Sequence, residues 1–264
     1  MKITRSVSRV SAQEIAPQDR PLSLSFGVPE IDGHLAGGGL RLDAIHEFLP
    51  EDFTARAAAY GFLTALIGRL MRQGTGPVIF CDFQRRTADR LLPFGPGLMA
   101  LGLDPGRLIH VQSASETDFF WSLEEALTCS RPLAVIGIAG ETSLYDFTES
   151  KRLNLRAHRQ GKPLFLLRAG ETAGATACAS RWRIGALPGA RPSSQAGQSR
   201  RGFFLPPLGD PCWRLSLVRA QGSRPQAWPV RWDHETLRFH LAAPLAARTI
   251  GDPDRAPVRR TAGS

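Results

Sequence analysis

GGGLRLDAIHEFLPEDFTARAAAYGFLTAL, residues 37–66, holds a strand, a turn and a helix in immediate succession. The three glycines indicate a tight turn, and the apolar run 42–49 after them predicts a strand. Helical spacing predicts a helix over 53–72 that begins at Asp52 as N-cap and has one apolar face: Ala59, Phe62, Leu63, Leu66, Ile67 and Leu70. This is the frame of a phosphate-binding loop, but the turn after residue 49 has no glycine and no lysine follows it.

Strands and helices alternate along the chain from about residue 42 to residue 169. Beyond the opening strand and helix, we predict strands in 74–83, 107–112, 132–140 and 162–170, and helices in 116–129 and 145–161. The segment 87–101 is interrupted by prolines and glycines, so we expect it to be irregular. Such alternation predicts an α/β fold, with a mostly parallel twisted sheet flanked by helices on both faces.

From residue 177 the pattern changes to short strands typical of antiparallel hairpins. They lie in 176–188, 212–222, 226–233 and 236–243. We therefore predict four segments: a flexible N-terminal segment 1–20, a core 21–190, a basic β-hairpin region 191–245 within the same domain, and a disordered tail 246–264.

The composition limits the class of protein. The 264 residues are 42% hydrophobic, which suits one globular domain with appendages. The net charge is +9, and residues 191–264 contribute +7 of it through twelve Arg and five acidic residues. A basic C-terminal third favours an anionic partner, either nucleic acid or an acidic protein surface. Residues 1–20 lack the apolar core of a signal peptide and no run approaches about 18 apolar residues, so we expect no signal peptide, no membrane partner and a cytoplasmic protein.

Other kinds of site find little support. The histidines are scattered without Cys or acidic residues at ligand spacing, which argues against a metal site. His46 and Glu47 are interpreted as ordinary strand residues. Phe119, Phe120 and Trp121 are interpreted as the buried start of a helix, with an exposed contact site as the alternative. The cysteines are far apart and predict buried thiols in a reducing compartment: Cys81, Cys129, Cys178 and Cys212.

The stretch SFGVPEIDGHLAGGGLRLDAIHEFLPED, residues 25–52, resembles the opening of the RecA family core. Four further pieces resemble, more narrowly, the ImuA family of the bacterial mutasome. They are FFWSLEEAL (119–127), DFTESKRLNLRAHRQGKPLFLLR (146–168), RWRIG (181–185) and WRLSLVRAQGSRPQAWPVRWDHETLRFHLAA (213–243). The resemblance runs from about residue 22 to residue 245, and it implies a RecA-like core.

The same resemblance identifies the positions of a nucleotide site. It places Leu49 and Thr54 at the two glycines of the phosphate loop, Ala55 at the lysine and Arg56 at the metal-binding hydroxyl. Gln84 stands at the catalytic glutamate and lacks a carboxylate to act as general base. Because several separated positions have changed, we predict an inactive nucleotide site, no cofactor and no enzymatic activity. The alternative is that Arg56 contacts phosphate in place of the lysine, which would allow binding without hydrolysis.

Nucleic-acid binding stays open at this point. The stretches 139–146 and 168–177, which the resemblance equates with DNA-contacting loops, are short and contain acidic residues. In the basic region, alternation places Trp228, Val230, Trp232, Leu237, Phe239 and Leu241 inward, and Pro229 suggests an edge strand. Its arginines form either a solvated face or a docking surface for protein or DNA. The candidate contacts are Arg200, Arg201, Arg214, Arg219, Arg231 and Arg238.

The resemblance implies a non-catalytic adaptor in DNA-damage-induced mutagenesis and translesion synthesis. Its implied partners are an ImuB-type Y-family polymerase homologue and RecA, with an error-prone replicative-type polymerase contacted indirectly. One alternative is a cell-division inhibitor of the SulA type, which would filament cells even without RecA. Another is an ATP-dependent recombinase of the RecA class, against which the altered phosphate loop argues.

Overall fold

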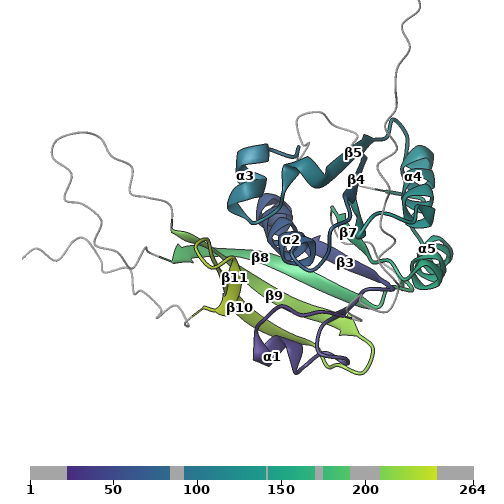
Figure 1. Cartoon of the computed structure of the whole chain (residues 1–264). Helices are drawn as coiled ribbons and strands as arrows, with labels where there is room; N and C mark the ends of the chain where they lie inside the picture. The colour runs from purple at the N-terminus through teal and green to yellow at the C-terminus, as the bar shows by residue number, and fades with distance from the viewer. Residues whose placement is uncertain (1–22, 84–91, 141, 170–174, 191–208, 243–264) are drawn as a thin grey trace, which may run out of the picture.

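The computed structural model describes residues 23–83, 92–140, 142–169, 175–190 and 209–242. Nine strands of these residues form one mixed sheet in the order β11-β10-β9-β8-β3-β7-β6-β4-β5 (Figure 1). The six strands from β8 to β5 in this order are parallel: β3 (Ile45–Pro50), β4 (Val78–Phe83), β5 (Leu108–Gln112), β6 (Ala134–Ala139), β7 (Leu164–Arg168) and β8 (Ser180–Ala190). Antiparallel ladders then add β9 (Asp210–Ala220), β10 (Gln226–Asp233) and β11 (Arg238–Leu241).

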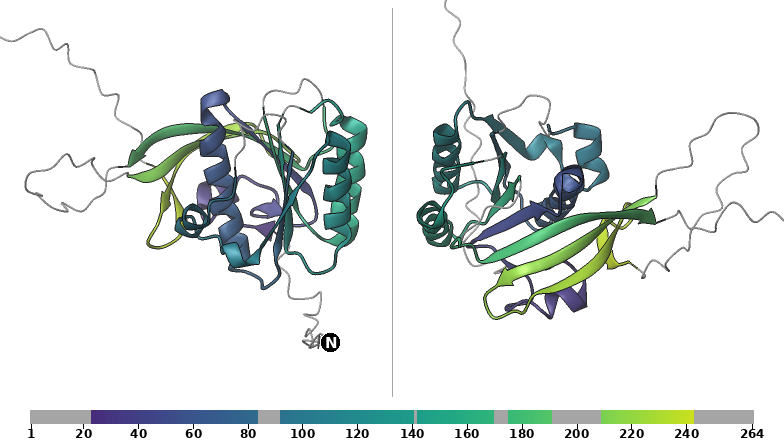
Figure 2. Two further views of the ribbon diagram at one scale, coloured as in Figure 1. Left: turned by 90° about the horizontal axis from the view of Figure 1, so that it is seen from above. Right: turned by 180° about the vertical axis from the view of Figure 1, so that it is seen from behind.

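Helices cover the parallel part of the sheet on both faces (Figure 2). One face carries α2 (Arg56–Met71), which continues from the 3₁₀ turn η2 (Phe53–Ala55), and α3 (Gly95–Ala100). The other face carries α4 (Glu116–Thr128) and α5 (Phe147–Gln160). The predicted α/β class, with a large mixed sheet between helices, is confirmed. The smaller elements are β1 (Ser23–Leu24), α1 (Pro29–Asp32), β2 (Leu40–Arg41) and the 3₁₀ turn η4 (Pro105–Arg107).

The antiparallel strands curl around α2, which explains why this helix is buried on several sides. Phe62 is the central contact. Its ring centre lies 6.0 Å from that of Phe48 on β3, 5.7 Å from Trp213 on β9 and 5.4 Å from Phe239 on β11. The six residues of the predicted apolar face of α2 are buried, and further residues of the helix are buried as well because β9 and β11 also contact it.

One residue, Gly161, determines where α5 ends. Gly161 caps the helix in the left-handed conformation at φ 54°, and its backbone N–H bonds back to the last helical turn. Only glycine adopts this backbone region without strain. The chain therefore turns sharply into β7, as the sequence predicts.

The inward residues of the basic region are mostly as predicted. Trp228, Val230, Trp232 and Phe239 are buried in the same apolar cluster as α2. The prediction for Leu241 is wrong, since 39% of this residue is exposed at the end of the edge strand β11. The prediction that Pro229 marks an edge strand is also wrong, because β10 lies between β9 and β11. The proline is tolerated because it sits just where the ladder with β11 ends, at Val230.

Two smaller expectations are corrected on the other side of the molecule. Phe119 and Phe120 are buried, but Trp121 is 63% exposed because it projects from the outer side of α4. Cys81, Cys178 and Cys212 are buried thiols as expected, whereas Cys129 is exposed just after α4. None of the helices in the described part of the chain is long and apolar enough to cross a membrane.

Candidate functional site

The phosphate-loop position lies at the carboxyl end of β3, a central strand with β7 on one side and β8 on the other. Ligand sites of open α/β sheets form at this edge. The turn brings together four predicted site residues: Leu49, Thr54, Ala55 and Arg56. Leu49 and Ala55 are buried, so neither presents a group to a ligand.

Asp52 takes up donors at the start of the helix. Its Oδ1 accepts hydrogen bonds from the Ala55 backbone N–H at 3.0 Å and from the Thr54 hydroxyl at 2.6 Å. These bonds lower the pKa of the Asp52 carboxyl, with the Thr54 hydroxyl as the larger cause. The predicted N-cap is confirmed, and it places a negative charge at the end of the helix that would otherwise attract an anion.

Phe53 and Arg56 occupy the outer side of the same turn. Phe53 is 72% exposed, and the Arg56 guanidinium lies 5.6 Å from the centre of its ring. This geometry is a cation–π contact within the protein. It turns the one cation of the loop toward an aromatic ring at the surface.

Glu51 fastens the loop to the antiparallel strands. Its backbone N–H donates to Ile184 O on β8 at 2.8 Å. Its carboxylate pairs with Arg214 Nη1 on β9 at 3.0 Å and lies over Gly185, where a Cβ would collide with it. The turn is thus held by contacts to β8 and β9.

The second predicted position, Gln84, lies outside the described residues. Two residues before it, Asp82 at the end of β4 is buried, and its Oδ2 lies 2.9 Å from His110 Nε2 on β5. The described residues contain no group of three His, Cys, Asp or Glu side chains that could hold a metal ion. This end of β4 therefore offers a single His–Asp pair.

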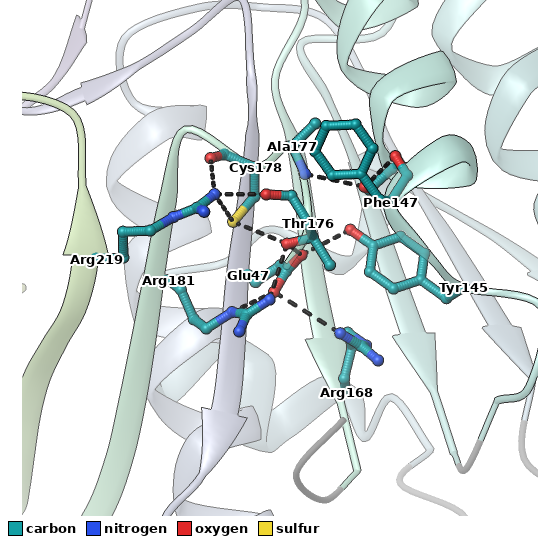
Figure 3. Close-up of polar contacts among 10 residues, drawn as sticks. Glu47, Tyr145, Phe147, Arg168, Thr176, Ala177, Cys178, Arg181 and Arg219 are labelled. Atoms are coloured by element: carbon teal, nitrogen blue, oxygen red, sulfur yellow. Dashed lines mark hydrogen bonds and ion pairs between the residues drawn. The ribbon is translucent and has the colours of Figure 1, made fainter. Parts of the chain in front are cut away.

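The most extensive polar cluster centres on Glu47, in the middle of β3 (Figure 3). The carboxylate is fully buried. Its Oε1 accepts from the Tyr145 hydroxyl at 2.8 Å and from the Thr176 hydroxyl at 2.6 Å, and its Oε2 accepts from Arg181 Nε at 2.8 Å. Arg168 Nη1 completes the cluster at 3.7 Å from Oε2.

The neighbours of Glu47 are bonded to each other as well (Figure 3). The Arg168 guanidinium lies 4.3 Å from the centre of the Tyr145 ring. Burial and the nearby Glu47 carboxylate raise the pKa of Tyr145 well above its usual value. Arg219 Nη2 on β9 donates to the carbonyls of Thr176 and Cys178 at 2.5 and 3.1 Å.

This cluster joins the two segments that the sequence equated with DNA-contacting loops. Tyr145 belongs to 139–146, and Arg168 and Thr176 belong to 168–177; Glu141 and Glu171 of these segments lie outside the described residues. Sequence reasoning missed Glu47 by treating it as ordinary strand sequence. The available signal was a carboxylate inside an apolar strand, because such a group requires partners when it is buried.

The predicted arginines of the basic region do not converge on one point. Arg214 pairs with Glu51, Arg231 pairs with Asp210 at 2.8 Å, and Arg219 holds the backbone before β8. Arg238 is exposed on β11. Arg200 and Arg201 lie outside the described residues.

Comparison with known proteins gives a specific result. The chain is 35% identical over 243 residues to proteins named ImuA from Caulobacter vibrioides strains NA1000 (CB15N) and CB 15. The alignments cover 86% of this chain and 91% of each relative. No family model matches the chain.

Proposed function

Because the chain belongs to the ImuA family, we propose that it is a non-catalytic accessory protein of DNA-damage-induced mutagenesis. In this role it is an adaptor with a RecA-like core. It docks on an ImuB-type Y-family polymerase homologue and on RecA, and through the ImuB-type protein it serves an error-prone replicative-type polymerase. The function lies in its contacts with other proteins.

The observation that carries this proposal is that Asp52 caps η2, the 3₁₀ turn that leads directly into α2. A phosphate loop binds its ligand through backbone N–H groups at a helix N-terminus, aided by a lysine. Here the Ala55 N–H is bonded to the Asp52 carboxylate. A phosphate at this place would meet a negative charge, and Ala55 supplies no compensating cation. The turn therefore stands at the position of a nucleotide site with the Ala55 backbone donor already occupied.

The Glu47 cluster supports the same proposal. It ties segments 142–146 and 175–178 to β3 and β8 through hydrogen bonds that satisfy both carboxylate oxygens. A nucleotide-driven switch needs an element with two arrangements that the ligand can bias. A network bonded in this way favours one arrangement, as suits a constant docking body.

The test is a pull-down with purified proteins. The full chain is immobilised and challenged separately with the ImuB-type protein and the RecA of the same organism, with and without ATP and Mg²⁺. The proposal predicts retention of the ImuB-type protein, and of RecA, that is unchanged by nucleotide. If neither the ImuB-type protein nor RecA is retained under low-salt conditions, the adaptor role is ruled out.

A further inference from the structure

The sheet ends at β5, whose outer edge is covered by no other strand of the described residues (Figure 1). On its inner side β5 pairs with β4 in parallel register. All five residues of β5 are exposed or partly exposed, and Ile109 is 49% exposed. An edge strand presents unpaired backbone N–H and C=O groups along its free side, so β5 can accept a further strand.

The ladder with β4 shows which backbone groups of β5 point outward. The N–H of Ser113, the residue just after β5, donates to Asp82 O on β4 at 2.9 Å. Backbone groups alternate between the two sides of a strand, so Ile109 and Val111 bond toward β4 as Ser113 does. The N–H and C=O of His110, between them, therefore point away from the sheet. They place one donor and one acceptor at the centre of the free edge.

The two edges of the sheet differ in their protection against pairing. At the other edge β11 has only four residues, and one of them is the exposed Arg238, whose charge opposes the addition of a strand. The sequence of β5, LIHVQ, contains no Lys, Arg, Asp, Glu or Pro. The His110 ring is held toward the sheet, since its Nε2 lies 2.9 Å from Oδ2 of the buried Asp82. Neither charge nor proline on β5 opposes a further strand.

The segment before β5 adds exposed apolar surface. Its helix α3 lies against β5, because Leu98 and Leu108 line the same narrow pocket. In this segment Leu92, Phe94 and Met99 are 57%, 68% and 58% exposed. Large apolar side chains exposed together in one region of a surface mark an interaction site. These residues favour a protein as the occupant of the edge.

The sequence of β5 is complementary to itself in an antiparallel arrangement. With a two-fold axis at His110, this residue lies opposite His110 of a second copy, and Ile109 lies opposite Val111. The two His110 residues then exchange both N–H···O=C bonds, as the outward direction of their backbone groups requires. Ile109 and Val111 form a non-hydrogen-bonded pair, where side chains lie closest, and the symmetry forms it twice. Val111 already packs against the apolar cluster beneath α4, so each pair extends that cluster.

We propose that two copies of this chain pair edge to edge through antiparallel β5 strands, with the two-fold axis at His110, so that their sheets form one continuous sheet. A second copy fits better than a foreign strand, because the same five residues supply both halves of every contact. Closed two-fold dimers are also the commonest oligomers of soluble proteins. The dimer goes beyond the proposed function and does not depend on which partners the chain binds.

Sedimentation equilibrium of the full chain, from micromolar to submillimolar concentration, measures this dimer. Wild type should approach twice the 28.8 kDa mass of the chain as its concentration rises. Ile109→Lys places a charge against Val111 of the second copy and should weaken dimerisation at least about tenfold. Val218→Lys is the matched control on β9, where Val218 is 41% exposed, and it should change the dissociation constant less than about twofold. Thermal melts establish that both variants fold.

A disulfide test checks the register of the two strands. It uses a Cys129→Ser background, which removes the exposed thiol. Ile109→Cys combined with Val111→Cys places cysteines opposite each other across the axis, with Cα atoms about 4.5 Å apart, and mild oxidation should give a covalent dimer. Ile109→Cys alone places the two cysteines on a diagonal about 8 Å apart, which is too far for a disulfide.

Three results would overturn the inference: a wild type that stays at the monomer mass, an Ile109→Lys variant that dimerises as tightly as wild type, or equal yields of covalent dimer from the single and double cysteine variants. If wild type is monomeric and Ile109→Lys no longer retains the ImuB-type protein or RecA, the edge receives a strand of that partner instead. Failure of wild type to retain either partner refutes the proposed function and leaves the dimer standing.

Discussion

Glu47 shows how one side chain can hold a fold together from inside a strand. An ionised carboxylate in the core costs several kcal/mol unless partners compensate for the lost water. Here two hydroxyls and the Arg181 guanidinium supply that compensation within 2.8 Å. The partners come from segments up to 134 residues away. Spacing along the sequence gives no sign of such distant pairs, so the cluster could not be predicted.

Replacing the Glu47 carboxylate should strongly lower the stability of the protein. Glu47→Gln removes the charge and points amide hydrogens at donors, which leaves the buried Arg168 and the half-buried Arg181 without their counter-ion. We expect a loss of about 3–5 kcal/mol in the free energy of unfolding, measured with urea. Glu51→Gln is the matched control, because its pair with Arg214 is exposed and should be worth less than about 1 kcal/mol. Equal losses in the two variants would contradict the role assigned to Glu47.

His46 should make stability depend on pH. It is fully buried, and burial lowers its pKa from 6.5 to about 4, although the bond to the Arg41 carbonyl opposes this. Ser180 Oγ bonds to His46 Nδ1 and accepts from Trp182 Nε1, so the serine hydroxyl hydrogen is available for Nδ1. His46 Nε2 then donates to Arg41 O at 2.8 Å. This chain of bonds fits the neutral imidazole.

The sign of the effect follows from this pKa. Below about pH 6.5 His46 is protonated in the unfolded chain but stays neutral in the folded chain. The free energy of unfolding therefore falls as pH drops toward 4. Between pH 7 and pH 5 the His46 contribution should decrease by about 2 kcal/mol. Urea unfolding of wild type and His46→Gln at both pH values measures this difference. An identical pH dependence in the two proteins would refute the neutral buried histidine.

Most individual elements could be predicted, because each depends on local pattern. Buried runs such as 78–83 became parallel strands, and Asp52 and Gly161 mark helix ends by their own chemistry. Errors arose where a neighbour distant in sequence decides the outcome. Pro229 is internal because β11 returns beside it, and α2 is buried widely because β9 and β11 curl over it. The Trp121 position depends on which side of α4 meets the sheet.

Two glycines should respond in opposite ways to alanine. Gly161 has a positive φ and no atom within 4 Å of an added Cβ, so Gly161→Ala should cost about 1 kcal/mol through backbone strain alone. Gly61 lies inside α2, where a Cβ would make ordinary contacts at 3.8–3.9 Å, so Gly61→Ala should stabilise by up to about 1 kcal/mol. Urea unfolding of the two variants gives both values. The capping account fails if Gly161→Ala is as stable as wild type.

The whole molecule consists of one sheet with two differently covered parts. The parallel part lies between helix layers, and the carboxyl end of β3 leads into the turn that holds Glu51 and Asp52. The antiparallel part packs one face against α2. The sequence predicted a basic β region near the C-terminus, but the choice of arginines that share a face needed the strand registers. The turn after β3 and the Glu47 cluster are connected through β8, because Glu51 bonds to Ile184 O and Glu47 bonds to Arg181.

The central claim is that the phosphate-loop position no longer holds a nucleotide. It is tested most directly by titrating the purified full chain into a fluorescent ATP analogue with Mg²⁺ and following anisotropy, with an active RecA as the positive control. The account predicts no saturable binding up to millimolar protein or nucleotide, because Asp52 occupies the helix N-terminus and Ala55 provides no cation. Saturable binding in the micromolar range that is lost in Arg56→Ala would contradict it, and the protein would then be a nucleotide-controlled switch.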